Sequence, residues 1–381
     1  MKLTRAVTHR FVIPVLTILL LAACSSTPTT TPKPTTTLPR DTPKPSVPTQ
    51  EPASLPLSEP GSYHAGIRRN LAFQDASRGG RKVAITIWYP AAMPQDSTST
   101  RPTSDAVADP TGAPYPLILS SSKVAYTFGP LLASYGFVVV GVNGLDYYIP
   151  WDSNLVDQPL DILFALNQVA AHPIVGLEGM IDAQHAGAMG YSFDGYNALA
   201  LSGARVDPDF YLTECAVTPL RRHWVQFGYC NLASAWDQFA AHAGEAITTS
   251  DDGLWQPMTD ERIRAVMPMA PEGAALFGER GLSAVDRPTL IIGATDDIDC
   301  DYHDEAVYIF EHAGTPDKML ISFVGQNHSM VFDTDMVSRM AHFAVAFFGY
   351  QLQGREDFAR YLSQEFIAQQ EDLAWGEYEG E

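Results

Sequence analysis

Short apolar runs alternate with longer amphipathic stretches along the chain from Tyr63 onward. Several runs are continuous instead of alternating with polar residues, as expected for strands of a sheet that helices cover on both faces. The predicted strands span 81–89, 115–120, 136–143, 186–190, 263–270, 288–293 and 318–324, with an amphipathic helix over 157–171. Because strands and helices alternate, the pattern predicts an α/β fold.

The N-terminus has the features of an export signal. A positively charged start precedes an apolar run over 11–22, which is too short for a convincing membrane span. The run ends in Leu21-Ala22-Ala23-Cys24, which resembles the lipobox of bacterial lipoproteins. This resemblance implies that residues 1–23 are removed and that Cys24 is lipidated; an ordinary signal peptide with an incidental cysteine is the alternative. We expect an exported protein, lipid-anchored to the bacterial cell envelope at the outer membrane or the cell surface.

A segment rich in Thr and Pro follows the predicted lipidation site. Residues 24–60 cannot bury a core and favour an extended polyproline conformation. We therefore expect a disordered linker over 24–60 and a folded domain over 61–381.

Composition narrows the classes of partner. The 381 residues include 44 acidic and 24 basic side chains, a formal net charge of −20. Such a surface repels phosphate backbones, so we expect no nucleic-acid partner. The four cysteines form no CxxC pair and no Cys/His cluster with zinc spacing. We expect no metal and no organic cofactor, and the composition leaves the oligomeric state open.

The alternation of strands and helices breaks over 207–259, a long connection rich in aromatic residues. Insertions of this size are often functional, so we predict a helical lid or pocket wall; a helical subdomain that only packs on the core is the alternative. The insertion contains Cys215 and Cys230, and export favours a disulfide between them over two separate thiols. Cys300 lies outside the insertion, and we expect it to be a bystander.

The strongest candidate for chemistry is Ser192. It lies in Gly190-Tyr191-Ser192-Phe193-Asp194-Gly195, where a predicted strand meets a predicted helix, as in a nucleophile elbow. Small residues flank such a serine because the strand and helix backbones crowd there. Gly190 meets this demand, whereas Asp194 departs from G-x-S-x-G, and a short Asp fits there if its side chain points outward. A role for Ser192 as a helix cap is the alternative.

A nucleophilic serine needs a base and an acid downstream. His328 follows the last predicted strand and is the candidate base; a surface histidine is the alternative. Asp296 and Asp297 follow the strand that ends at Gly293, and either has suitable spacing for the acid. We favour Asp297, with Asp296 and Glu272 as alternative acids.

These segments resemble the dienelactone-hydrolase-like branch of the α/β-hydrolases, which includes platelet-activating-factor acetylhydrolases and bacterial polyester hydrolases. The matching pieces are Gly66-Ile67-Arg68, Asp75-Ala76-Ser77-Arg78, Ile87-Trp88-Tyr89-Pro90, Gly190-Tyr191-Ser192-Phe193, 198–204 and 288–293. The resemblance covers about 63–361. It implies a mostly parallel, eight-stranded sheet with helices on both faces and a triad of Ser192, Asp297 and His328.

The resemblance also implies an oxyanion hole made of two backbone N–H groups. Phe193, directly after the candidate nucleophile, should supply one. The second should come from the polar loop that follows Ser120, with Lys123 favoured over Ser122 and Val124.

We therefore expect a hydrolase that cleaves a small-molecule or lipid-like carboxylic ester through an acyl-serine intermediate. Three alternatives stay open. The first is a narrower enzyme, a phospholipid acetylhydrolase or a polyester or cutinase-like hydrolase. The second is an amidase or peptidase on the same fold. The third is a non-catalytic, surface-binding lipoprotein. The departure from G-x-S-x-G at Asp194 is the reason to retain this alternative.

Overall fold

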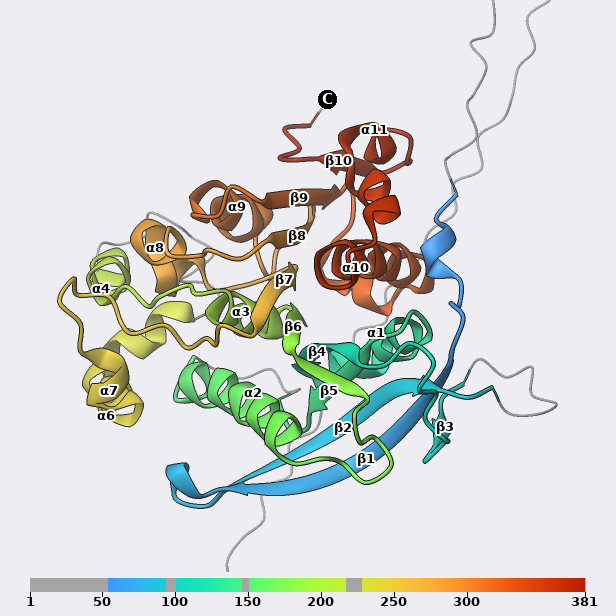
Figure 1. Cartoon of the computed structure of the whole chain (residues 1–381). Coiled ribbons are helices and arrows are strands. Elements are labelled where there is room, and N and C mark those ends of the chain that lie inside the picture. Colours follow the sequence, from blue (N-terminus) through green and yellow to red (C-terminus); the bar gives the residue numbers. More distant parts are fainter. Residues whose placement is uncertain (1–53, 94–100, 146–150, 217–227, 381) are drawn as a thin grey trace, which may run out of the picture. The chain divides into compact units, whose positions relative to one another are not determined.

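One mixed β-sheet organises the computed structural model, which describes residues 54–93, 101–145, 151–216 and 228–380 (Figure 1). Within these residues ten strands follow the order β10-β9-β8-β7-β6-β4-β5-β2-β1-β3. All neighbours from β9 to β5 are parallel. By contrast, β2 pairs antiparallel with both β5 and β1, and β10 pairs antiparallel with β9. The fold is therefore α/β with a mostly parallel sheet.

The central strands coincide closely with the apolar runs of the sequence. The strands span His64–Asp75 (β1), Arg81–Ala91 (β2), Thr103–Ser104 (β3), Tyr115–Ser121 (β4), Val138–Val142 (β5), Ile181–Tyr191 (β6), Ile263–Met269 (β7), Thr289–Ala294 (β8), Lys318–Phe323 (β9) and Leu373–Trp375 (β10). Every residue of β4, β5 and β8 is buried. This burial explains why these strands lack polar alternation.

Helices cover both faces of the sheet (Figure 1). The described α-helices are Ser122–Ser134 (α1), Asn154–Ala171 (α2), Phe193–Leu201 (α3), Pro208–Ala216 (α4), Trp236–Ala243 (α6), Glu245–Thr248 (α7), Ala274–Leu282 (α8), Tyr308–His312 (α9), Thr334–Gln353 (α10) and Gln364–Ile367 (α11). Shorter helical turns are Pro56–Ser58 (η1), Ala76–Arg78 (η2), Tyr229–Ala235 (η3), Tyr302–Val307 (η4), His328–Phe332 (η5) and Glu356–Leu362 (η6). Apolar side chains of α1 and α10 pack on one face, and those of α2 and α3 pack on the other.

The sheet has ten described strands rather than the expected eight. Three strands, β1, β3 and β10, were not among those predicted from the apolar runs. The second half of β1 is mostly half-buried or exposed, so its apolar pattern is weak. At two and three residues, β3 and β10 are too short to have a readable period. All three lie at or next to an edge of the sheet, where backbone pairing rather than burial defines a strand.

The fold begins before the predicted linker ends. Leu57 in η1 is 6% exposed, and its N–H donates to Nδ1 of His342 on α10 at 3.1 Å. An apolar side chain within a polar segment thus binds the start of the domain to its core. The predicted export signal, Cys24 and most of the predicted linker lie outside the described residues. In the part of the chain that the structure covers, no helix is both long and apolar enough to cross a membrane.

The described part of the 207–259 insertion is helical, with α4, η3, α6 and α7. A disulfide links Cys215 and Cys230, whose Cα atoms are 5.2 Å apart. Aromatic side chains of the insertion, including Phe239 stacked on Trp255 at 5.0 Å between ring centroids, pack in one apolar cluster with residues of α2, α3 and α8. Its role as a lid stays a prediction.

Candidate active site

Ser192 lies in a sharp turn between β6 and α3. Its φ of 61° and ψ of −125° are values that a residue with a side chain rarely adopts. A Cβ at Gly190 would lie 1.8 Å from the carbonyl oxygen of Asp194, so position 190 requires glycine. The turn presents Ser192 at the carboxyl end of β6, in the strand–turn–helix setting of a nucleophile elbow.

Asp194 fits in the turn although its side chain points inward, so the condition of an outward side chain is wrong. The residue is 5% exposed. Its carboxyl group accepts hydrogen bonds from Oγ of Ser121 and from Nδ2 of Asn197, the latter at 3.1 Å. Glycine is needed one position later, because a Cβ at Gly195 would lie 2.7 Å from Cα of Pro271. The steric demand that G-x-S-x-G meets with its last glycine therefore falls on position 195.

His328 lies between Ser192 and Asp297. Its Nε2 is 2.9 Å from Oγ of Ser192, and its Nδ1 is 2.8 Å from Oδ2 of Asp297. The hydroxyl of Tyr191 donates to the carbonyl oxygen of His328 at 2.6 Å, which ties the start of η5 to the end of β6. The structure thus brings the three predicted triad residues into one hydrogen-bonded row.

Of the two adjacent aspartates, Asp297 faces the imidazole. Asp297 is 3% exposed, and its Oδ1 accepts the N–H groups of Asp299 and Cys300 at 2.9 Å each. These two bonds orient the carboxylate so that Oδ2 faces His328. Asp296 is exposed to solvent. Spacing along the chain could not separate the two residues, because both lie in the same turn and only the directions of their side chains differ.

Glu272, the remaining candidate acid, is buried beside aromatic side chains. Its Oε2 lies 3.4 Å from Nε1 of Trp151. Burial raises the pKa of Glu272, although hydrogen bonds from Tyr229 and Trp151 oppose this change. The Nδ1 atom of His328 bonds to Asp297 instead.

Burial and the neighbouring carboxylate act on His328 in opposite directions. Burial disfavours the imidazolium, whereas the hydrogen bond with Asp297 and its negative charge favour it. The net effect raises the pKa of His328 above its ordinary value of 6.5. The imidazolium that would form when His328 takes a proton from Ser192 is therefore stabilised in place.

The predicted oxyanion donors stand at the starts of two helices. Phe193 is the first residue of α3, and Ser122 is the first residue of α1. N–H groups in the first turn of a helix have no carbonyl partner within that helix, which is why helix starts often bind anions. The N–H of Val124 already donates to Oγ of Ser121 at 3.3 Å. Lys123, with Ser122 as an alternative, stays a prediction for the second donor.

Cys300 lies against the candidate nucleophile, which sequence reasoning missed. Its Sγ is 4.0 Å from Oγ of Ser192, and the residue is 4% exposed. Burial raises the pKa of the Cys300 thiol well above its ordinary range, so the reactive thiolate is disfavoured. Its position three residues after Asp297, in the loop that surrounds this carboxylate, was visible in the sequence but did not indicate on which side of the loop the thiol lies.

Aromatic side chains adjoin the same loop. Trp151 and Tyr229 stack with ring centroids 4.3 Å apart. The hydroxyl of Tyr229 lies 3.4 Å from the carbonyl oxygen of Asp299. The insertion that contains η3 therefore contacts the loop that carries Asp297.

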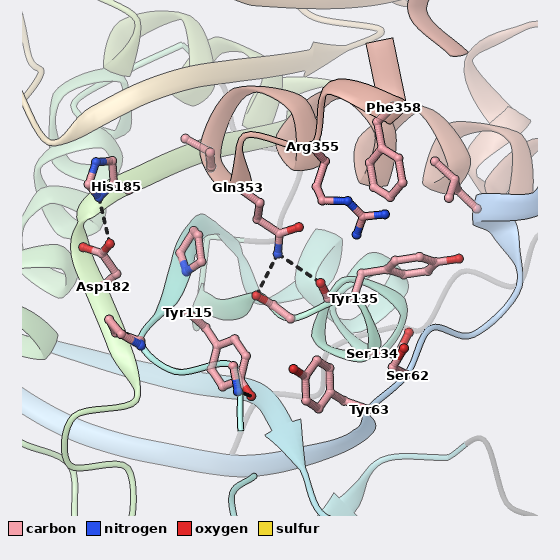
Figure 2. Close-up of a pocket in the computed structure, with 16 residues that line it drawn as sticks. Ser62, Tyr63, Tyr115, Ser134, Tyr135, Asp182, His185, Gln353, Arg355 and Phe358 are labelled. Atoms are coloured by element: carbon pink, nitrogen blue, oxygen red, sulfur yellow. Dashed lines mark hydrogen bonds and ion pairs between the residues drawn. The ribbon is translucent and has the colours of Figure 1, made fainter. Parts of the chain in front are cut away.

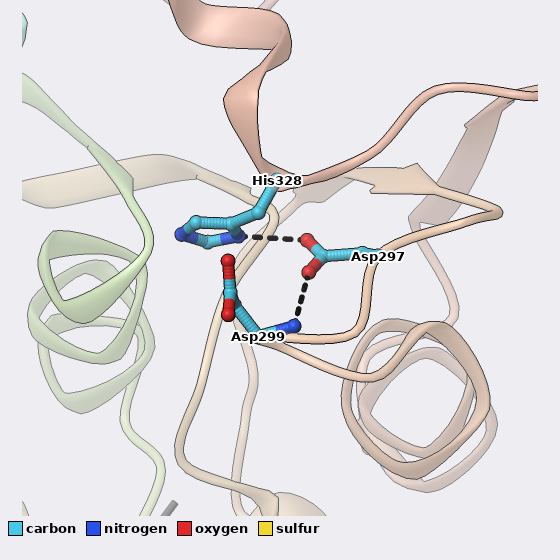
Figure 3. Close-up of side chains that lie close together, drawn as sticks. All are labelled: Asp297, Asp299 and His328. Atoms are coloured by element: carbon cyan, nitrogen blue, oxygen red, sulfur yellow. Dashed lines mark hydrogen bonds and ion pairs between the residues drawn. The ribbon is translucent and has the colours of Figure 1, made fainter. Parts of the chain in front are cut away.

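Asp299 completes a group of possible metal ligands with Asp297 and His328 (Figure 3). One potential donor atom from each residue lies within 4.8 Å of the other two. However, Nδ1 of His328 and both oxygens of Asp297 already take part in hydrogen bonds. A cation bound here would compete with the contact between His328 and Asp297.

The arrangement can move a proton from Ser192 to His328 while Asp297 balances the positive charge that results. The protonated imidazole can then return that proton to a leaving group. Comparison with known proteins adds no assignment, since neither a protein-family model nor a curated protein matches the chain.

Proposed function

We propose that the protein is a serine hydrolase of the α/β-hydrolase class that cleaves carboxylic esters. The observation that carries the proposal is the row of contacts from Ser192 through His328 to Asp297, at 2.9 and 2.8 Å. The strained serine turn after β6 and the order Ser, Asp, His along the chain also support it.

In the proposed reaction, Oγ of Ser192 attacks the ester carbonyl while Nε2 of His328 takes the hydroxyl proton. The oxyanion of the tetrahedral intermediate accepts hydrogen bonds from Phe193 and from the first turn of α1. His328 then protonates the leaving alkoxide as the acyl-serine forms. Water attacks this intermediate, gives a proton to His328 and releases the carboxylic acid, and the proton returns to Ser192.

An ester with an apolar acyl or aryl part suits the surroundings of this site. Cys300 lies beside Ser192, and Tyr229, which stacks on Trp151, contacts the loop that carries Asp297. We therefore expect short and medium p-nitrophenyl esters to be turned over. Turnover of a platelet-activating-factor analogue, of polyester film or of a matched anilide would show which of the narrower alternatives applies.

Export and lipid anchoring through Cys24 are part of the same proposal, supported by the lipobox-like sequence before this cysteine. Growth of an expressing bacterium with an alkyne-tagged fatty acid should label the full-length protein. The label should be lost in Cys24→Ala, and a Cys24→Ala protein that is labelled as strongly as the wild type would contradict the anchor.

Covalent labelling tests the nucleophile. A fluorophosphonate probe should label the wild type, and Ser192→Ala should lose both the label and at least about 10⁴-fold in kcat for p-nitrophenyl butyrate. Ser283→Ala is the matched control, because Ser283 is an exposed serine at the end of α8. Its labelling and turnover should equal those of the wild type. A folded wild type that neither reacts with the probe nor hydrolyses any ester or amide of the panel would refute the proposal.

A further inference from the structure

A buried polar contact links the two helix starts at the candidate active site. Asp194, in the first turn of α3, accepts a hydrogen bond from Oγ of Ser121, which caps the start of α1. Both residues are nearly inaccessible to solvent, at 5% and 1% exposure. They lie 73 positions apart in the sequence, so this contact exists only in the folded chain.

Each end of this contact is held by further bonds. Nδ2 of Asn197 donates to the other carboxyl oxygen of Asp194 at 3.1 Å, and it also donates to Gln158 on α2 at 2.9 Å. Oγ of Ser121 accepts the N–H of Val124 at 3.3 Å. The carboxyl group of Asp194 therefore has little freedom to move, and a buried network of this kind rigidifies its surroundings.

The same two helix starts carry the N–H groups proposed above as oxyanion donors. Phe193 directly precedes Asp194, and Ser122 and Lys123 directly follow Ser121. Oxyanion donors act by being fixed in advance where negative charge develops, so their spacing affects the rate of the chemical step. Asp194 is the residue by which this chain departs from G-x-S-x-G, and its side chain supplies a contact that glycine could not make.

We propose that Asp194 is a positioning residue that, through Ser121, fixes the start of α1 relative to the start of α3 and so sets the spacing of the two oxyanion donors. This inference rests on the hydrolase function proposed above. Asp194 acts through Ser121 and does not itself touch the reacting atoms.

The test compares Asp194→Ala, Asp194→Asn, Ser121→Ala and the double variant Asp194→Ala/Ser121→Ala. Each protein is first titrated with the fluorophosphonate, so that kcat refers to active sites only. The affinity of phenylboronic acid, which forms a tetrahedral adduct with a nucleophilic serine, is then measured as a second readout of the oxyanion hole. Ser120→Ala is the matched control, since this buried hydroxyl on β4 donates to the carbonyl oxygen of Met189 at 2.8 Å and not to Asp194.

We expect each alanine variant to lose roughly 10- to 100-fold in kcat, with KM changed less than about twofold. The affinity for phenylboronic acid should fall in parallel with kcat. The double variant should be no worse than Asp194→Ala alone, because all three variants remove the same hydrogen bond between Asp194 and Ser121. Asp194→Asn keeps an acceptor oxygen and should recover most of the loss, and Ser120→Ala should retain wild-type kcat.

Several outcomes would overturn the inference. Losses that multiply in the double variant would mean that the two residues act independently. An unchanged kcat per titrated site, even with a lower melting temperature, would reduce Asp194 to a structural role. If Asp194→Ala fails to fold, Asp194→Asn and Ser121→Ala still decide the matter through kcat and boronate affinity. A wild type without labelling or turnover would instead refute the hydrolase function itself.

Discussion

Two His–Asp pairs among the described residues share nearly the same contact between Nδ1 and Oδ2 but have very different surroundings. At the carboxyl ends of the strands, Nδ1 of His328 lies 2.8 Å from Oδ2 of Asp297. Near the amino end of β6, Nδ1 of His185 lies 2.7 Å from Oδ2 of Asp182. The side chains of the first pair are 20% and 1% exposed, whereas those of the second pair are 54% and 24% exposed.

The second pair even borders a sizeable cavity (Figure 2). This cavity of about 680 Å³ lies at the amino ends of β4 and β6 and includes Tyr115, Tyr135 and Phe358 among its aromatic lining residues. Within this lining, Nε2 of Gln353 donates to the carbonyl oxygens of Tyr135 and Gly136 at 3.0 Å each. Among the described residues, no serine hydroxyl bonds to His185. The comparison teaches that a cavity and a His–Asp contact are not enough to propose a catalytic site, and that the proposal at Ser192 rests on a strained serine on the far side of a half-buried imidazole.

The largest effect should separate the two pairs directly. Asp297→Asn should lower kcat for p-nitrophenyl butyrate by roughly 10³- to 10⁴-fold, because the amide no longer stabilises the imidazolium. Asp182→Asn, the same change in the other pair, and Asp296→Asn, the same change one residue away, should stay within about twofold of the wild type. Steady-state kinetics on the three proteins measures this, and equal losses in Asp297→Asn and Asp296→Asn would remove the distinction.

The pH dependence of kcat/KM should sharpen the comparison. His328 must be neutral to act as a base, so activity should fall as pH drops through its pKa. Because the net effect of burial and the Asp297 carboxylate raises that pKa, the midpoint of the acidic limb should lie above 6.5. Removing the carboxylate leaves burial as the larger influence, so the residual activity of Asp297→Asn should have its midpoint at lower pH. A midpoint unaffected by this substitution would mean that the limb reports another group.

A substitution of Glu272 tests whether this buried acid, on the loop after β7, acts together with Ser192 and His328. Glu272→Gln should keep kcat within about tenfold of the wild type, since Nδ1 of His328 bonds to Asp297. Folding raises the pKa of Glu272, so the stability that this group contributes is present below its unfolded pKa and is lost as pH rises through its folded pKa. The free energy of unfolding of Glu272→Gln relative to the wild type should therefore increase with pH, as denaturation curves from pH 4 to pH 8 would measure. Should Glu272→Gln inactivate the enzyme while Asp297→Asn does not, the acid would come from the loop after β7.

The smallest effect is expected at the amino ends of the strands. His185→Ala and Arg355→Ala alter the cavity of Figure 2 but leave the contacts among Ser192, His328 and Asp297 in place. Ester turnover should stay within about twofold of the wild type, because neither residue contacts a reacting group. A tenfold loss in either variant, with an unchanged melting temperature, would show that this cavity influences the chemistry.

Local patterns in the sequence were enough to predict the central strands and to select two of the three members of the row. β4, β5 and β8 are buried throughout, and continuous apolar runs predict such strands. Ser192 is marked by a strand, a turn and a helix that are contiguous in the chain, and His328 by its place after the last long strand. The short edge strands β3 and β10 depend on pairing with distant residues and leave no such pattern.

The sequence by itself thus determined the α/β layout and the candidates Ser192 and His328, because both follow from residues that are neighbours along the chain. The tertiary structure alone decided that Asp297 rather than Asp296 faces the imidazole, that Asp194 turns inward and that Cys300 lies beside Ser192. These outcomes depend on which side of a turn faces the interior. Contacts that bridge 31 to 136 positions of sequence set that direction, and spacing along the chain does not encode it.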